Sequence, residues 1–263
     1  MIVEQIWTNN PYRNFNYLLA CDETGEALAI DPLDHSKCLN IAKDNGWDIT
    51  KIINTHHHLD HIGGNDQLIS KTNAKLLAHE NANHLINNID IGLSGGDVVK
   101  IGKTIELEVL DTPGHTMSHV CLLSHSNVPS LFSGDTLFNA GAGNCHNGGD
   151  PYYLFSTFKN ILSKLKDDTL LYPGHEYIEN NIRFTLNLEP DNLYAKDMLD
   201  RVSNQDPNYP FVTNIGIEKK INTFFRLNEK LIIENIVKLD PEIKNKLNKK
   251  NIFLALRELR NNW

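Results

Sequence analysis

The sequence predicts an α+β domain over residues 1–175, followed by a helical domain over residues 176–263. In the first part, short runs of aliphatic, aromatic and β-branched residues alternate with segments whose apolar residues recur at helical spacing. After residue 175 the helical spacing continues, but the strand signal almost disappears. A length of 263 residues, of which 40% are hydrophobic, is sufficient for one large domain and a small second one.

The N-terminal part of the chain alternates strands with short helices. A helix is predicted from Ser36 to Gly46, because glycine suits a helix end, and another from about Gly64 to Thr72. A further short helix is predicted around Ala82 to Asn88. Turn residues separate the predicted strands, which cover residues 2–7, 15–20, 26–31, 49–54 and 74–79.

The middle of the chain is rich in strand signals, with predicted strands at residues 103–112, 120–125 and 129–135. A helix is predicted over residues 150–167, and the strand 169–173 closes the first domain. The C-terminal domain is predicted to contain short helices at residues 178–188, 192–202, 230–239, 241–248 and 252–260.

Charge and composition exclude several classes of partner. The formal net charge of −8 argues against nonspecific binding to nucleic acid or to an anionic membrane surface. No apolar run approaches the roughly 18 residues of a membrane span. The N-terminal residues lack the basic and apolar regions of a secretory signal, and the four cysteines are scattered without a CxxC pair. We therefore expect a cytoplasmic protein with free thiols.

The segment THHHLDH at residues 55–61 concentrates four imidazoles and one carboxylate within six residues. Imidazolium groups at this density would repel one another, and burying them unpaired would cost several kcal/mol. A metal ion removes both objections, because neutral imidazole and carboxylate are its natural ligands. His56 and His58 stand two residues apart at a predicted strand end, so their side chains point the same way.

Three later segments supply further candidate ligands, each just past a predicted strand. They are TPGHTMSH with His115, SGDT with Asp135, and YPGHEY with His175. The complete set of candidates is His56, His58, Asp60, His61, His115, Asp135 and His175. This set is large enough for two divalent metal ions with positions left for water, and we expect zinc, with iron or manganese as alternatives that accept the same ligands.

These segments, in this order over about residues 50–178, resemble the metallo-β-lactamase superfamily, whose signature is HxHxDH. The resemblance implies an αββα sandwich with a dinuclear metal site at one edge of its two sheets. It assigns His56, His58 and His115 to the first metal. It assigns the second metal to Asp60, His61 and His175, and places Asp135 as the bridging ligand.

The segment YPGHEYIENNIRFTLNLEPDN and the helical C-terminal part resemble the glyoxalase II (hydroxyacylglutathione hydrolase) family more narrowly. By this resemblance Tyr177, Arg257 and Arg260 contact glutathione, and guanidinium groups suit its glycine carboxylate. The loop at residues 141–149 departs from the family pattern. Asn144 stands where the family has a basic residue and His146 where it has an aromatic one, which implies altered glutathione binding or a related thiol.

The expected activity is hydrolysis of the thioester S-D-lactoylglutathione to D-lactate and glutathione, the second step of methylglyoxal detoxification. A dinuclear site makes hydroxide available near neutral pH, and Asp60 would orient it towards the thioester carbonyl. The thiolate leaves readily, because thiol pKa values lie near ~8.5. The resemblance also implies a monomer.

Four alternatives remain open on the sequence. A mononuclear-iron persulfide dioxygenase shares the superfamily, although that group generally lacks the long helical part. The others are a thioesterase for a different thiol ester, a lactamase or lactonase, and a metal-stabilised binding protein without turnover. The complete ligand set argues against the last of these.

Overall fold

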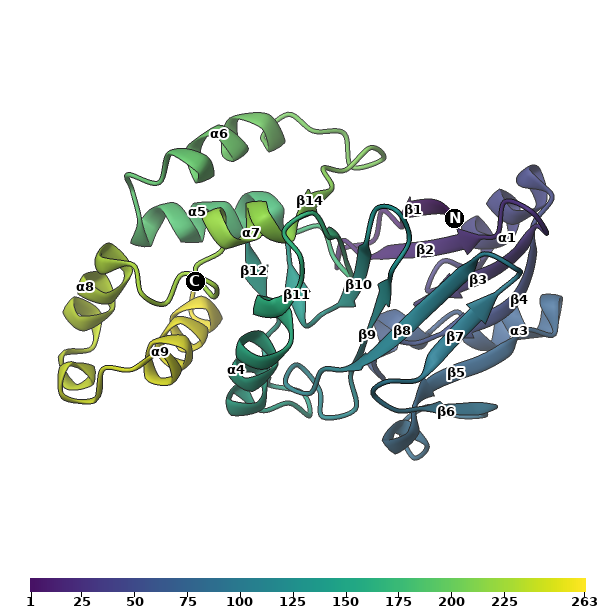
Figure 1. Ribbon diagram of the computed structural model, residues 1–263, viewed down its shortest axis with the longest axis horizontal. Coiled ribbons are helices and arrows are strands. Elements are labelled where there is room, and N and C mark those ends of the chain that lie inside the picture. Colours follow the sequence, from purple (N-terminus) through teal and green to yellow (C-terminus); the bar gives the residue numbers. More distant parts are fainter.

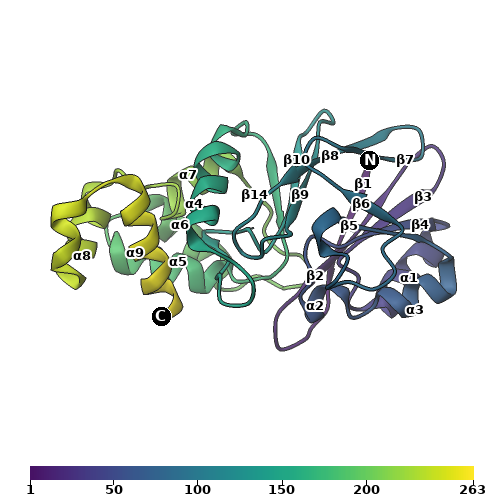
Figure 2. The same ribbon diagram turned by 90° about the horizontal axis from the view of Figure 1, so that it is seen from below.

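The computed structural model describes all residues, 1–263, and contains two six-stranded β-sheets that pack face to face (Figure 1). Helices cover the outer faces of both sheets. The helices after residue 175 gather at one end of the molecule, beside α4 (Pro151–Asn160), as Figure 2 shows from below. The predicted α+β sandwich with a C-terminal helical part is confirmed.

The first sheet combines antiparallel and parallel pairing. Its first three strands pair antiparallel, and the next three extend the sheet in parallel. The strands, in spatial order, are β1 (Ile2–Trp7), β2 (Phe15–Ala20), β3 (Glu26–Ile30), β4 (Asp48–Ile53), β5 (Lys75–His79) and β6 (Ile91–Leu93). The helical connections are α1 (His35–Asn45), α2 (Leu59–Ile62), α3 (Asn65–Thr72) and the 3₁₀ turn η1 (Glu80–Ala82).

The second sheet is mainly antiparallel, with one parallel pair between β10 and β13 that α4 and η2 (Leu162–Lys164) connect. Its strands, from one edge to the other, are β14 (Thr213–Asn214), β13 (Leu170–Pro173), β10 (Ser130–Gly134), β9 (Val120–Ser124), β8 (Ile105–Asp111) and β7 (Val98–Ile101). A small hairpin, β11 (Leu137–Phe138) and β12 (Gly141–Ala142), lies between β10 and α4 in the chain.

The core between the sheets follows from the alternation of side chains along each strand. In β8, Ile105, Leu107 and Val109 are buried, and the residues between them are exposed or partly exposed. These side chains pack with Tyr17 and Phe132 in one continuous apolar cluster. This cluster fixes the two sheets against each other, and the strand ends and loops at one edge carry the functional residues.

The C-terminal helices pack on the second sheet through another core. Phe158 of α4 meets Phe224 and Phe253, with ring centroids 6.1 and 5.3 Å away, and all three are buried. The helices are α5 (Ile178–Leu188), α6 (Leu193–Val202), α7 (Ile215–Ile221), α8 (Lys230–Leu239), the 3₁₀ helix η3 (Pro241–Lys246) and α9 (Lys249–Asn261). None of the helices combines the length and apolar character needed to traverse a membrane.

The structure corrects the sequence prediction at several elements. The helix predicted around residues 82–88 is wrong, since only the 3₁₀ turn at Glu80–Ala82 forms there. The helix predicted over residues 150–167 ends at Asn160. Strands β6 and β14 were not predicted, because segments of three and two residues show no periodicity. The seven-residue helix α7 was also not predicted. Since β14 pairs with β13, the helical part also contributes a strand to the second sheet. The division into two domains at residue 175 stays a prediction.

Candidate metal centre

The seven candidate ligands converge from the ends of strands in both sheets. His56 and His58 follow β4, and Asp60 and His61 lie in the short helix α2. His115 lies between β8 and β9. Asp135 directly follows β10, and His175 lies just past the end of β13. Three groups of side chains at this place have ligand atoms close enough to hold a metal ion, and two of them are the sets expected for the first and second metals.

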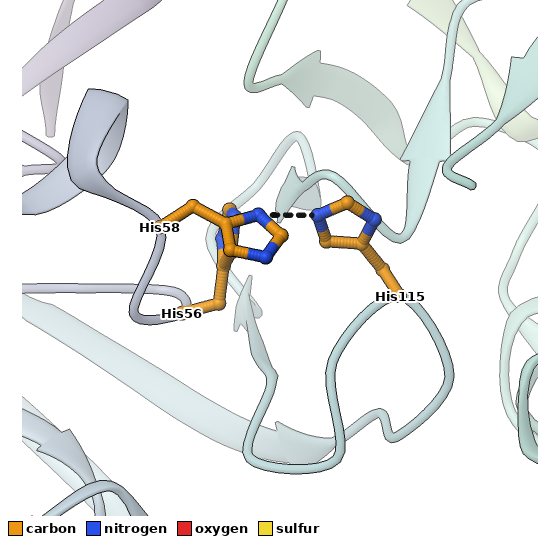
Figure 3. A group of neighbouring side chains, drawn as sticks. All are labelled: His56, His58 and His115. Atoms are coloured by element: carbon orange, nitrogen blue, oxygen red, sulfur yellow. Dashed lines mark hydrogen bonds between the residues drawn. The ribbon is translucent and has the colours of Figure 1, made fainter. Parts of the chain in front are cut away.

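The first set brings three imidazole nitrogens to one point (Figure 3). His58 Nδ1 lies 3.0 Å from His56 Nε2 and 3.1 Å from His115 Nε2. Tetrahedral zinc with Zn–N bonds of about 2.0–2.1 Å separates its ligand nitrogens by roughly 3.3 Å. The arrangement therefore fits a divalent metal ion.

In each histidine ring, the hydrogen bond of one nitrogen leaves the other nitrogen free to bind the metal ion. His58 Nε2 donates to the main-chain oxygen of Asn147 at 2.9 Å, and His115 Nδ1 donates to that of Asn144 at 2.7 Å. His56 Nδ1 lies 3.0 Å from the Thr55 hydroxyl. These contacts leave His56 Nε2, His58 Nδ1 and His115 Nε2 unprotonated and directed at the metal position.

Burial keeps two of these rings neutral. It lowers the pKa of His56 well below its ordinary value and that of His115 to about 4. A neutral imidazole is the form that binds metal, so these two rings are ready as ligands at pH 7 without losing a proton.

The second set consists of Asp60, His61 and His175. The Nε2 atoms of His61 and His175 are 3.2 Å apart, and Asp60 Oδ2 lies 3.4 Å from His175 Nε2. His175 Nδ1 donates to the main-chain oxygen of Tyr12 at 2.6 Å, so Nε2 faces the site. These nitrogen and oxygen donors fit a second divalent ion.

Asp135 stands between the two sets. Its Oδ2 is 3.1 Å from His175 Nε2 and 3.6 Å from His115 Nε2, and its buried Oδ1 has no hydrogen-bond donor. Burial opposes ionisation, yet the His175 and His61 imidazoles hold the pKa of Asp135 well below its usual range. An ionised, buried carboxylate without a donor on one oxygen fits a ligand that bridges two cations.

The sequence reasoning missed two residues that hold the ligands in place. Asp31, in the left-handed region with φ 48°, accepts from the Thr55 amide at 2.8 Å and contacts His61 Nδ1 at 2.9 Å. Asn14 Nδ2 donates to Asp60 Oδ2 at 3.0 Å. Asp31 ends the predicted strand 26–31 and could have been found as another acidic residue at a strand end. Asn14 carries no such signal.

Two of the expected substrate contacts, Tyr177 and Asn144, lie directly against candidate metal ligands. Tyr177 stacks on His175, with ring centroids 5.0 Å apart and an angle of 7°, and its hydroxyl donates to Tyr12 O at 2.9 Å. Arg260 Nη2 donates to Asn181 Oδ1 at 3.1 Å. Asn144 and His146 are exposed on the loop that follows β12.

Arg257 is buried and makes hydrogen bonds within the protein, which the sequence did not predict. It is 5% exposed, and its Nη1 donates to the main-chain oxygens of Ala142 and Gly143 at 2.6 and 3.0 Å. Burial lowers its pKa to about 10, so it remains charged at pH 7. Its side chain therefore binds the base of the loop that carries Asn144, and its contact with glutathione stays a prediction.

Comparison with known proteins agrees with this architecture. Residues 16–175 match the family model described as metallo-beta-lactamase superfamily, and residues 176–263 match that of the hydroxyacylglutathione hydrolase C-terminus. The crystal structure of ETHE1 from Myxococcus xanthus superimposes with a TM-score of 0.69 at 24% identity, covering 99% of this chain and 98% of that one. Fold and site together define a protein of the metallo-β-lactamase superfamily.

Two full-length relatives identify the family within this superfamily. Hydroxyacylglutathione hydrolases of Nitrosococcus oceani and of Polaromonas sp. are 59% and 57% identical over 263 residues, which cover 100% of this chain and of each relative. The chain belongs to the hydroxyacylglutathione hydrolase family. The resemblance seen in the sequence is confirmed.

Proposed function

We propose that the protein hydrolyses S-D-lactoylglutathione to D-lactate and glutathione. The observation that carries the proposal is the pair of ligand sets joined by Asp135, with Tyr177 stacked on the ligand His175 at the start of the C-terminal helices. The name shared by the two full-length relatives supports the same reaction and the thioester class of substrate.

We assign the two metal positions as the resemblance implies. The first is held by His56, His58 and His115, and the second by Asp60, His61 and His175; Asp135 reaches both. Two divalent ions in such a site supply hydroxide near neutral pH and polarise a bound carbonyl group. We propose zinc in both positions, and metal analysis of the purified chain, grown with zinc, iron and manganese all present, tests this choice.

Asp60 has a second role in the reaction. Its side chain is 26% exposed, so it reaches both the metal ligands and the substrate side of the site, and Asn14 fixes its Oδ2. It orients the water that attacks the thioester carbonyl carbon. The C–S bond then breaks, and the glutathione thiolate leaves without a dedicated general acid, because thiol pKa values lie near ~8.5.

Glutathione recognition is assigned to the helical part and to the loop after β12. Arg260, beside Asn181, offers a guanidinium to the glycine carboxylate. Tyr177, Asn144 and His146 provide further polar contacts on the same side. Arg257 contributes by fixing the loop and by its positive charge.

The steady-state rate on S-D-lactoylglutathione tests the proposal. Asp60→Asn should lower kcat at least a hundredfold, because it removes both a ligand charge and the group that orients water. Arg260→Ala should raise KM about tenfold with little change in kcat, since it removes binding that substrate and transition state share. Arg183→Ala, an exposed arginine of the same helical part paired with Glu179, is the matched control.

The outcome separates the alternatives. A doubly metallated protein without turnover of this thioester would refute the proposal. Oxygen consumption with glutathione persulfide would instead favour the iron dioxygenase, and turnover of another thiol ester would point to the altered loop with Asn144 and His146.

A further inference from the structure

The turn between β11 and β12 is held by side chains of the C-terminal helices. Ala140, in this turn, has φ 55°, a left-handed conformation that is unfavourable for a residue with a Cβ atom. Asn181 of α5 donates to Asn139 O at 2.9 Å, and Asn222 donates to Gly141 O at 3.0 Å. Glu218 of α7 accepts from the Ala140 amide at 2.8 Å. Three consecutive residues, Asn139 to Gly141, are thus fixed by hydrogen bonds from outside the hairpin.

Glu218 is an unusual residue for this position. It is 0% exposed, and its donors are all neutral: the Ala140 amide, the Thr213 hydroxyl at 2.6 Å and the Asn222 amide at 3.1 Å. No cation faces it, and burial raises its pKa to about 7. A buried carboxyl group without a counter-charge lowers stability relative to an apolar residue. Its hydrogen bonds to the turn give a reason for its presence.

The loop that follows the hairpin contains the main-chain acceptors of two metal ligands. After β12, the main-chain oxygens of Asn144 and Asn147 accept from His115 Nδ1 and His58 Nε2 at 2.7 and 2.9 Å. Gly143 fits tightly beneath them, since a Cβ atom there would overlap the main-chain oxygen of Asp135. A shift of the hairpin would therefore move the acceptors that orient both imidazoles.

The hydrogen bonds that orient the second set of ligands do not come from this hairpin, although Phe138 of β11 packs edge-on against the His175 ring with centroids 5.8 Å apart. His61 is oriented by Asp31 and His175 by the main-chain oxygen of Tyr12. Asp31 directly follows β3 of the first sheet, and Tyr12 lies in the loop before β2. A change in the turn at Ala140 should consequently affect the first metal position much more strongly than the second, whose orienting hydrogen bonds remain.

We propose that Glu218 is a positioning residue for the first metal position, acting through the turn at Ala140 and the carbonyl groups of Asn144 and Asn147 on His115 and His58. This inference rests on the metal assignment of the proposed function but not on its substrate. The helical part thereby takes part in building the metal site as well as in binding substrate.

Metal retention by the full chain tests this role. The protein is loaded with two Co²⁺ ions, and their loss to increasing chelator is followed by metal analysis and by the visible absorption of each ion, with His115→Ala marking the bands of the first position. Glu218→Ala should lose the first ion at about tenfold lower chelator concentration and keep the second, because partners that orient ligands change metal affinity by roughly 10–100-fold. Glu218→Gln, which retains an acceptor for the Ala140 amide, should remain within about threefold of the wild type.

The control is Glu189→Ala. Glu189 is a buried glutamate of the same helical part, but it pairs with Arg226 and has no contact with the hairpin. It should release both ions like the wild type. Equal behaviour of the Glu218 and Glu189 variants, whether both lose their metal or both retain it, would overturn the proposal.

Two further variants keep the test decisive if Glu218→Ala does not fold. Asn222→Ala removes the bond to Gly141 and one donor to Glu218, but it keeps the bond between Glu218 and the Ala140 amide, and it should show the same selective loss. Adding Ala140→Gly to Glu218→Ala should restore part of the affinity, because glycine adopts φ > 0 without strain. Wild-type metal retention by Asn222→Ala together with no restoration by glycine would refute the role. Since no substrate is present, failure of the thioesterase assay leaves this result unaffected.

Discussion

Individual hydrogen bonds at the ring nitrogens determine the geometry of the metal centre. His58 presents Nδ1 to the first metal position, whereas His56 and His115 present Nε2. The difference follows from the acceptors on the far side of each ring: Asn147 O fixes His58 through Nε2, and Asn144 O fixes His115 through Nδ1. The sequence predicted the ligands but not the nitrogen that each one uses, because that choice depends on main-chain atoms far away in the chain.

Asp31 offers a test at the same scale. It contacts Thr55 and His61 from a buried position. Asp31→Ala should therefore weaken the second metal position by roughly 10–100-fold, as for other partners that orient a ligating histidine. Metal content after dialysis against a weak chelator measures this. Asp44→Ala, on the exposed side of α1, should bind as the wild type does. Full retention of both ions in Asp31→Ala would contradict the role given to this carboxylate.

Among the elements, α7 introduces a pH dependence into the stability of the fold. Burial raises the pKa of Glu218 from its ordinary 4.5 to about 7. Between those values the unfolded chain has lost a proton that the folded protein keeps, so stability falls as pH rises. The free energy of unfolding of the wild type, relative to Glu218→Gln, should drop by about 2.5 kcal/mol between pH 5 and pH 8.

Denaturant unfolding of both proteins at saturating metal measures this difference. Groups common to the two proteins cancel in the comparison, and only the titration of Glu218 remains. A difference that stays constant with pH would show that Glu218 ionises normally in the folded protein.

Helix α9 is attached through aromatic packing. Phe253 has 0% exposure and lies 5.1 Å from Phe224 and 5.3 Å from Phe158, measured between ring centroids. Phe253→Ala should lower the free energy of unfolding by about 3–5 kcal/mol, because a large buried ring leaves a cavity. Chemical denaturation checks this, with the 82% exposed Tyr209 changed to alanine as the control, which should change stability by less than about 0.5 kcal/mol.

For the whole molecule, much of the fold and the ligand set could be predicted from the sequence. Long periodic segments such as β8, and ligands placed at strand ends, carry local signals. The hydrogen bonds to the hairpin could not be predicted in this way. Glu218, Asn181 and Asn222 are recognisable as its partners only from their long-range contacts with residues 139–141. The hydrogen bonds of Arg257 to the base of the loop after β12 likewise depend on packing between distant parts of the chain.

The shared core makes a prediction about the two parts of the chain. One apolar cluster contains Leu131 and Leu171 of the second sheet together with Phe253 and Leu256 of α9. A fragment of residues 1–175 would expose that surface, so it should aggregate or show no cooperative thermal transition. Calorimetry and size-exclusion chromatography of the fragment test this. A monomeric fragment with a cooperative transition would establish an independent first domain.

The pairing of β13 with β14 also bears on how the chain folds during synthesis. β13 ends at Pro173, and its partner residues Thr213 and Asn214 leave the ribosome only later. Until then, the edge of the second sheet carries unpaired main-chain groups, and the apolar face awaiting α9 remains open. The nascent chain therefore needs the last part of translation to complete its second sheet. A pause within residues 176–212 would prolong an intermediate with an open sheet edge, and a stop there would release one, in either case prone to pair with other chains.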